Sequence, residues 1–172
     1  MPSILFVCTA NQFRSPLAAA QFSKKLNQQQ RPGKWEIASA GTWTTPGLAP
    51  TPAASRLARH CGLSLDGHHT ELVSHSRLAK FDLVLVMEAG HREALLAEFP
   101  SHGGRVYLLS EVVDQLHYDI PDPARLPQHA ERLVRELCEL IERGYENICK
   151  LAESIHAGDA KRLRPGTLLA QT

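Results

Sequence analysis

The chain has 172 residues, of which 43% are hydrophobic and 22% charged, and its formal net charge is +1. This length and composition are typical of one globular domain, and they exclude a disordered, collagen-like or repeat protein. A net charge so close to zero also excludes a global field that would attract nucleic acid or a membrane surface. An anion would therefore have to be bound by a local site.

The sequence indicates a cytoplasmic protein without membrane insertion. No stretch approaches the roughly 18 apolar residues that span a bilayer, and residues 4–7 are too short an apolar run for a signal peptide. The cysteines form no CxxC pair, which argues against a zinc ribbon or a disulfide scaffold. The local patch of Asp66, His68, His69 and His75 fits no strong zinc signature, so we expect surface histidines and no metal or other cofactor.

Strands and helices alternate through the first half of the chain. Residues 4–7 form a continuous apolar run, which is typical of a strand buried on both faces. A helix follows to about residue 27, with Ser15 as its N-cap and Pro16 as its first residue. A second strand is predicted at 35–40, a Pro/Gly/Thr-rich loop at 42–52, and a second helix at 53–61.

The alternation continues in the second half. Strands are predicted at 83–87 and 106–109, helices at 88–99 and 128–156, and a proline-rich loop at 118–127. Residues 1–158 are expected to form one domain, and residues 159–172 a flexible tail. This order predicts an α/β fold with a parallel sheet covered on both faces, and a ligand site beyond the carboxyl ends of its strands.

The loop after the first strand carries the chemistry. It reads CTANQFRS from Cys8 to Ser15, so that Cys8 leaves a buried strand and Arg14 stands close to a helix start. Backbone N–H groups, a helix N-terminus and a guanidinium together bind a phosphate dianion. The same surroundings favour the thiolate, the nucleophilic form of cysteine. A strand-end cysteine is commonly just a small apolar residue, but Arg14 and the strand–loop–helix context favour a reactive one.

A thiolate that attacks phosphorus also needs an acid to protonate the leaving oxygen. The best candidate is Asp122, which two prolines hold on a stiff loop, and Asp119 is the alternative. An Asp-Pro pair often does no more than start a turn, so this assignment depends on Cys8 and Arg14.

Together these features resemble the low-molecular-weight protein tyrosine phosphatase family. The resemblance runs to about residue 155 and includes the N-terminal phosphate loop, the string Ser39-Ala40-Gly41-Thr42, Asp82 before an apolar strand, and the late Asp-Pro. It implies a three-layer, flavodoxin-like sandwich with a four-stranded parallel sheet, the phosphate loop lying between the first strand and the first helix. It also implies a two-step mechanism without metal, through a phosphocysteine.

By position, the resemblance implies Cys8 as the nucleophile, Arg14 as the phosphate clamp and Asp122 as the general acid and then base. Substrate contacts would come from the rest of the loop and from an aromatic wall or rim residue, namely Thr9, Ala10, Asn11, Gln12, Phe13, Ser15 and Trp43. Within this set, Asn11 would fix the loop through its side chain and Ser15 would stabilise the thiolate.

Several positions depart from the family pattern. Ala10 stands where a glycine is usual and Phe13 where a second cysteine is usual, so Cys8 is expected to oxidise without that local partner. Gln12 replaces an apolar residue and could suit phosphoarginine instead of phosphotyrosine. Ala124 and Arg125 follow Asp122 where tyrosines are usual. Arg125 could attract acidic substrate sequence, although a solvated arginine is the simpler reading.

Three other functions stay open on the sequence. The scaffold could serve a protein-arginine phosphatase. An arsenate reductase would need resolving thiols, and Cys61, Cys138 and Cys149 lie in predicted helices without a close pair. A phosphopeptide-binding module would have no need for both Cys8 and Asp122. The partners we expect are a phosphorylated protein and, from the family's bacterial roles, a tyrosine kinase, with the chain a monomer or weak dimer.

Overall fold

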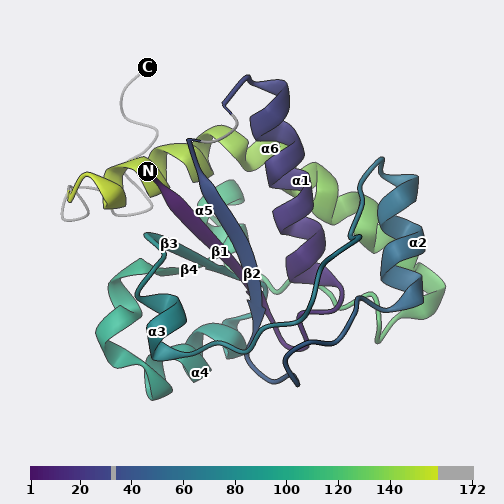
Figure 1. The fold of residues 1–172 in the computed structure, drawn as a ribbon, viewed down its shortest axis with the longest axis horizontal. Coiled ribbons are helices and arrows are strands. Elements are labelled where there is room, and N and C mark those ends of the chain that lie inside the picture. The colour runs from purple at the N-terminus through teal and green to yellow at the C-terminus, as the bar shows by residue number, and fades with distance from the viewer. Residues whose placement is uncertain (32–33, 159–172) are drawn as a thin grey trace.

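The computed structural model describes residues 1–31 and 34–158, and the tail expected at 159–172 lies outside the described residues. The sheet consists of four parallel strands in the order β2-β1-β3-β4 (Figure 1). Their bounds are Ser3–Cys8 for β1, Glu36–Gly41 for β2, Leu83–Val86 for β3 and Val106–Leu108 for β4. The predicted α/β fold is confirmed, with each strand close to its expected position.

Helices cover both faces of the sheet. One face is covered by α1 (Arg14–Gln28), α2 (Pro52–His60), α5 (Leu109–Asp114) and α6 (Ala130–His156), and the other by α3 (His75–Leu78) and α4 (Ala89–Glu98). Two short 3-10 helices, η1 (Pro100–Arg105) and η2 (Pro127–His129), complete the described elements. The result is the expected three-layer sandwich. Among the described residues, none of the helices combines the length and apolar character that crossing a membrane requires.

The two apolar cores follow from the alternation of side chains along a strand. All six residues of β1 are buried. Ile4, Phe6 and Cys8 point into the core beneath α1 and α6, whereas Leu5 and Val7 point into the core beneath α3 and α4. A strand buried on both faces has no polar side, which is why it appears in the sequence as an unbroken apolar run.

The start of α1 differs from the prediction. Phe13 precedes the helix, Arg14 is its first residue, and no side chain caps its N-terminus. Ser15 is therefore not the N-cap; it lies inside the first turn, completely buried. The prediction failed because a hydroxyl before proline is normally free to cap, whereas this hydroxyl is engaged by the loop that precedes it.

Two short helices have no counterpart in the predicted elements. Ser74 caps α3 through its hydroxyl, which accepts from the backbone N–H of Arg77. The apolar run that predicted a strand to residue 109 instead ends at Leu108, and Leu109 begins α5. Helices of four and six residues are too short to show a helical period, so sequence patterning does not find them.

The strand order places the site. After β1 the chain moves outward to β2 and then returns across β1 to β3, so the direction of winding reverses beside the carboxyl end of β1. Open parallel sheets bind ligands at such a switch point. Residues 9–13, which connect β1 to α1, lie there.

Candidate active site

The phosphate loop, residues 8–15, is built around one buried asparagine. Asn11 is fully buried and has a positive φ of 54°, a conformation that asparagine tolerates better than most residues. Its side-chain Nδ2 donates to Ser15 Oγ and to Ser39 Oγ, both at 2.9 Å, and its Oδ1 accepts from the backbone N–H of Glu71 at 2.9 Å. Every hydrogen-bonding position of the amide but one lone pair is thereby used, and the loop is tied to β2 and to the segment before α3.

A histidine supports the same residue from outside. His68 Nε2 donates to the backbone carbonyl of Asn11 at 2.8 Å. The backbone and the side chain of Asn11 are thus both held by residues that lie 28 to 60 positions further along the chain. Left-handed backbone at a non-glycine position persists only where its surroundings determine it, and these contacts provide that constraint.

Ser15 connects Asn11 to the cysteine. The Oγ atom of Ser15 lies 3.0 Å from Cys8 Sγ and 3.3 Å from the carbonyl oxygen of Ala40, while it accepts from Asn11 Nδ2. A hydroxyl has one proton to donate. It can be directed at the sulfur when Cys8 is a thiolate, or at Ala40 when the thiol donates to Ser15. The structure therefore places a hydrogen-bond donor beside the expected nucleophile.

Arg14 is almost completely buried, with 1% of its surface exposed, and its guanidinium is shared by three acceptors. Nη1 contacts Glu88 Oε1 and donates to the carbonyl of Ile120 at 2.7 Å, while Nη2 lies 3.3 Å from Asp122 Oδ2. A buried cation requires such partners. Arg14 consequently links the phosphate loop to the end of β3 and to the loop that carries Asp122.

The acid loop, residues 118–126, separates the two candidate acids. Asp122 lies against Arg14, and its Oδ1 accepts from the backbone N–H of Ala124 at 3.0 Å. Asp119 Oδ1 instead accepts from the backbone N–H of Ala89 at 2.7 Å, at the N-terminus of α4. A carboxylate at that position is stabilised by the helix end. The geometry therefore favours Asp122 over Asp119 as a proton donor to the pocket.

A second histidine stands behind the first residue of the loop. His91 is buried; its Nδ1 accepts from the backbone N–H of Glu88 at 3.1 Å, and its Nε2 lies 2.8 Å from Thr9 Oγ1. Burial lowers the pKa of His91, although the Glu88 carboxylate opposes this effect. The neutral ring, with its proton on Nε2, satisfies both contacts. The Thr9 hydroxyl is therefore held by a residue of α4.

Gly41, at the end of β2, allows β2 to approach the loop closely. A Cβ atom at this position would lie 2.5 Å from the carbonyl oxygen of Thr9, too close for any side chain. The backbone N–H groups of Thr42 and Trp43 donate to the carbonyls of Cys8 and Thr9 at 2.9 and 3.0 Å. The two residues that follow β2 are thus bonded along one side of the phosphate loop.

These segments enclose a small pocket. Its volume is about 80 Å³, and the predicted site residues Cys8, Ala10, Gln12, Phe13, Arg14 and Asp122 line it together with Thr51 and Ala124. Thr9, Asn11 and Ser15 support it from behind. Trp43 does not line it. It is 83% exposed and borders a neighbouring open groove of about 360 Å³, so the structure places it at the rim.

Gln12 separates the pocket from that groove, because it lines both. Its Nε2 donates to the carbonyl of Ala49 at 2.8 Å. The amide is therefore oriented by the loop before α2, and its Oε1 has no hydrogen-bond partner among the described residues. A polar acceptor of fixed orientation stands where the family usually has an apolar side chain.

Some residues of the site were not predicted. Glu88, His68 and His91 contact Arg14, Asn11 and Thr9 across 57 to 82 positions of sequence, a separation at which no local pattern points to a partner. Of these three residues, only Glu88 could have been found from the sequence. It comes directly after a buried apolar strand, where an acidic side chain would be expected at the same sheet edge as Cys8.

The remaining cysteines lie elsewhere, and only His68 of the histidine patch reaches the site. Neither Cys138 nor Cys149 lines the pocket, and burial raises the pKa of both thiols. His75 contacts His102 and not His68, so the patch is divided. In residues 1–31 and 34–158, no group of three His, Cys, Asp or Glu residues could hold a metal ion.

Comparison with known proteins now adds to this geometry. Residues 3–159 match the low molecular weight phosphotyrosine protein phosphatase family. The chain belongs to this family. The residues matched include the phosphate loop, the end of β2, Glu88 and the acid loop, which the structure brings to one edge of the sheet.

Relatives within the family carry two different activities in their names. The chain is 31% identical over 144 residues to a probable low molecular weight protein-tyrosine-phosphatase, EpsP, of Ralstonia nicotianae, covering 84% of this chain and 91% of that protein. It is 32% identical over 146 residues to a protein-arginine-phosphatase of Geobacillus stearothermophilus, covering 84% and 95%. The chain is thus a phosphatase-family enzyme, and these relatives do not decide between tyrosine and arginine.

A solved structure agrees with the fold. The tyrosine phosphatase Wzb of Escherichia coli K30, in complex with sulphate, superposes with a TM-score of 0.76 at 29% identity, covering 86% of this chain and 99% of that one. The two chains therefore share their architecture over nearly the whole of the relative.

Proposed function

We propose that this protein hydrolyses phosphate monoesters on proteins, with phosphotyrosine as the first candidate, through a phosphocysteine on Cys8. The observation that supports the proposal most is the meeting of Cys8, Arg14 and Asp122 around one pocket of about 80 Å³. A sulfur nucleophile, a cation for the phosphate and a carboxyl group for the leaving oxygen are what the reaction needs.

Binding begins with an exchange of partners at Arg14. The guanidinium contacts Asp122 in the free protein, and a phosphate dianion would take over this contact with two oxygens. The free N–H groups of the first turn of α1 would add to the attraction. Asp122 would then lose its cation and lie beside a dianion, and both changes favour its protonated form.

Two displacements at phosphorus follow. The Cys8 thiolate forms an S–P bond while the bond from phosphorus to the leaving oxygen breaks and Asp122 gives that oxygen its proton. Water then attacks the phosphocysteine, Asp122 accepts a proton from it, the S–P bond breaks, and inorganic phosphate leaves. Ser15 donates to the sulfur whenever it carries negative charge, at the start and at the end of the cycle.

The experiment that tests the proposal is the hydrolysis of p-nitrophenyl phosphate as a function of pH, with chelator present. Cys8→Ser should abolish turnover, by at least about 10⁴-fold, because the oxygen nucleophile is not activated. Asp122→Ala should lower kcat by about 10²- to 10⁴-fold and remove the limb of the pH profile that depends on an acid. A folded protein without turnover would contradict the proposal and favour a phosphopeptide-binding module.

A phosphoarginine substrate is the second candidate, and Gln12 favours it. The Oε1 of this amide faces no partner among the described residues while its Nε2 is held by Ala49. It could accept a hydrogen bond from a guanidinium N–H, which a phenol ring does not offer. The name of the Geobacillus relative shows that this family includes such an activity.

The choice is tested with matched phosphotyrosine and phosphoarginine peptides and a Gln12→Leu variant. Loss of an acceptor aimed at the substrate should lower kcat/KM for the phosphoarginine peptide by roughly 10- to 100-fold, the value of one hydrogen bond to a charged group. Phosphotyrosine turnover should stay level or rise. If both substrates change alike, Gln12 does not select between them.

The remaining expectations belong to this proposal. A phosphorylated protein would be the substrate, and a tyrosine kinase would be the enzyme that supplies it if phosphotyrosine is preferred. A thioredoxin-coupled arsenate assay is expected to show no turnover, because the pocket brings no second cysteine to Cys8. Cytoplasmic location and a monomer or weak dimer stay predictions.

A further inference from the structure

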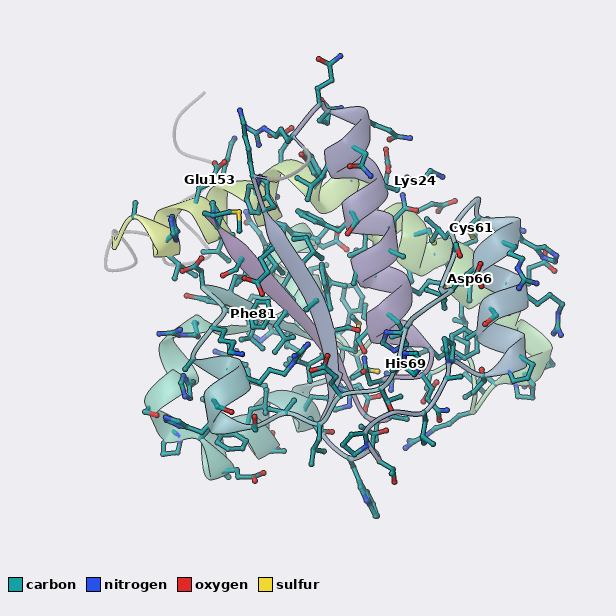
Figure 2. The ribbon with its side chains drawn as sticks, viewed as in Figure 1. Lys24, Cys61, Asp66, His69, Phe81 and Glu153 are labelled. Carbon is teal, nitrogen blue, oxygen red and sulfur yellow. The ribbon has the colours of Figure 1, made fainter. Side chains whose placement is uncertain are left out.

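The outer edge of β2 borders an open groove on the surface of the molecule. β2 is an edge strand and forms its ladder with β1 alone. Beside it lies a groove of about 560 Å³ whose walls are α1, β2 and residues 64–71. Figure 2 labels Asp66 and His69, which belong to the wall opposite β2. This groove is separate from the pocket that contains Cys8.

The direction of each backbone group of β2 follows from its ladder. The N–H groups of Glu36 and Thr42 donate to β1 and its preceding residue, at Pro2 and Cys8. Because backbone groups alternate in direction along a strand, those of Ile37, Ser39 and Gly41 point outward. Gly41 uses its outward groups: its N–H donates to the Glu71 carbonyl at 2.8 Å, and its carbonyl accepts from Val73 at 2.9 Å.

The contact at Gly41 is a single parallel bridge, with Leu72 as its partner. It marks the position of a fifth strand that the chain does not continue. Before Glu71 the chain turns away, since Thr70 exchanges backbone hydrogen bonds with Gly47 and Leu48 at 2.8 Å each. Figure 1 shows this segment running from α2 past α1 toward the end of β2. The space beside Ile37 and Ser39 is consequently left to the groove.

The outward groups in that space lack strong partners among the described residues. Neither the N–H nor the carbonyl of Ile37 is bonded outward, nor is the N–H of Ser39. The Ser39 carbonyl has only a long contact of 3.5 Å from Arg77 Nη2. Arg77 also lines the groove, and its Nε is a buried donor with no hydrogen-bond partner. Donors and acceptors therefore alternate along one side of the groove, with a further donor at its end.

An extended polypeptide matches this pattern, because its own N–H and carbonyl groups repeat with the same two-residue period of roughly 6.6 Å. We propose that the groove binds an extended segment of a partner protein, which adds a strand beside Ile37 and Ser39. The α1 wall consists of Pro16 and three small residues, Ala19, Ala20 and Ser23, and leaves room for β-branched side chains of that segment.

A second copy of this chain fits less well. An edge-to-edge pairing of two sheets needs both edges open over several residues. Here Leu72 already occupies the position beside Gly41, and residues 64–69 stand where the neighbouring sheet would lie. Between β2 and residues 64–69 the groove offers the width of a single strand and no more, which suits an isolated segment of another protein.

The groove also adjoins the catalytic machinery. Ser39 Oγ and the backbone N–H of Glu71, at the two sides of the groove, are both hydrogen-bonded to Asn11. A strand bound beside Ser39 would lie next to the residue that fixes the phosphate loop. A partner bound in the groove would therefore lie next to a residue that contacts the phosphate loop, and the pocket that contains Cys8 would stay open.

The test uses the full chain and an acetylated, amidated hexapeptide of alternating valine and threonine as the probe. Amide hydrogen exchange of Ile37 and Ser39 should slow about tenfold at a peptide concentration ten times its Kd. The amides of Ala38 and Ala40, which face β1, are internal controls and should not change. The same peptide N-methylated at alternate residues, which cannot form a ladder, should have no effect.

Two variants sharpen the test. Ile37→Pro removes an outward donor and no bond to β1, and Ser23→Trp fills the groove from α1. Either should abolish the effect of the peptide while p-nitrophenyl phosphate turnover, the measure of correct folding, is retained. If Ile37→Pro does not fold, Ser23→Trp alone decides.

Three results would overturn the inference. The first is unchanged exchange of Ile37 and Ser39 with peptide at millimolar concentration. The second is equal protection by the N-methylated peptide. The third is protection that grows with protein concentration when no peptide is present, which would assign the edge to a second copy of the chain.

Discussion

The phosphate loop and the acid loop face each other across one pocket but are held in different ways. Asn11, Arg14 and Ser15 are at most 1% exposed, and each makes several side-chain hydrogen bonds to other elements. In the acid loop, Ile120 and Pro123 are buried and most of their neighbours are exposed.

The acid loop is attached at its start, where Tyr118 bonds to Ser110 and Asp119 to Ala89, and by the backbone of Ile120. Its N–H donates to the Met87 carbonyl at 2.8 Å, and its carbonyl accepts from Arg14. The difference suits the two tasks. Binding a phosphate requires donors fixed in advance, whereas in the proposed mechanism Asp122 leaves Arg14 when substrate arrives. The nucleophile side is fixed by the fold, and the acid side is left adjustable.

Among the tests of this comparison, the largest effect is expected from breaking the phosphate loop at Asn11. Asn11→Ala leaves Ser39 Oγ and the Glu71 N–H without their partner, at about 1–3 kcal/mol for each buried group. Misplacement of the loop should lower kcat/KM about 100-fold. Chemical denaturation and p-nitrophenyl phosphate kinetics measure the two effects. Asn27→Ala, the same change at an exposed site on α1, is the control, and an equal loss there would contradict the assignment.

A smaller effect is expected where β2 meets the loop. Gly41→Ala places a Cβ at 2.5 Å from the Thr9 carbonyl, so one of the two segments has to move. Overpacking of this kind costs about 1–3 kcal/mol of stability. Gly90→Ala in α4 is the matched control, because nothing lies within 4 Å of its added methyl group and alanine favours a helix. Thermal unfolding should show a lower Tm than the unchanged protein for Gly41→Ala and no decrease for Gly90→Ala.

The adjustable side is tested with Pro121→Gly. Added freedom in the acid loop should cost about 1 kcal/mol of ordering, or roughly fivefold in kcat. The loss should be greater for phenyl phosphate, whose leaving group needs the proton, than for p-nitrophenyl phosphate. Inhibition by inorganic phosphate should not change, because it reports on the phosphate loop. A weaker affinity for phosphate would mean that the two loops are not independent.

The smallest effect is a pH dependence of stability that arises behind the loop. The pKa of His91 is lowered by burial, so between pH 6.5 and that lower value the unfolded chain binds more protons than the folded one. Stability should therefore fall as the pH drops below about 6.5. His91→Asn should make this fall shallower without removing it, since burial lowers the pKa of His102 as well. Urea unfolding at pH 7.5 and 5.5 measures the slope, and exposed His60→Asn should leave it unchanged.

The sequence was most informative where structure is local. Strands buried on both faces left unbroken apolar runs, and α6 left a helical period from Leu133 to Leu151. The predicted N-cap of α1 was wrong because the Ser15 hydroxyl is hydrogen-bonded to Cys8 and Asn11 of the preceding loop. Local preference predicts a cap, but the contact that overrides it is formed only when the loop closes.

The candidate site was predictable only in part for the same reason. Cys8 and Arg14 lie within one loop, so their spacing carries information. Glu88 and His68 reach the loop from distant segments, and only the fold brings them there. Trp43 was expected as a wall or a rim residue, and the backbone after Gly41 directs it to the rim, which no local pattern decides.

The Ser15 hydroxyl, which lies between Cys8 and Ala40, affects the energy needed to change the charge of the Cys8 sulfur. Oγ lies within hydrogen-bond distance of both Cys8 Sγ and the Ala40 carbonyl, so rotation about one bond changes its acceptor. When the sulfur gains or loses its charge, the response is the turn of one proton about an oxygen that stays in place. Neither water nor backbone has to move. The reorganisation energy that accompanies ionisation in solution is thereby largely absent at this sulfur.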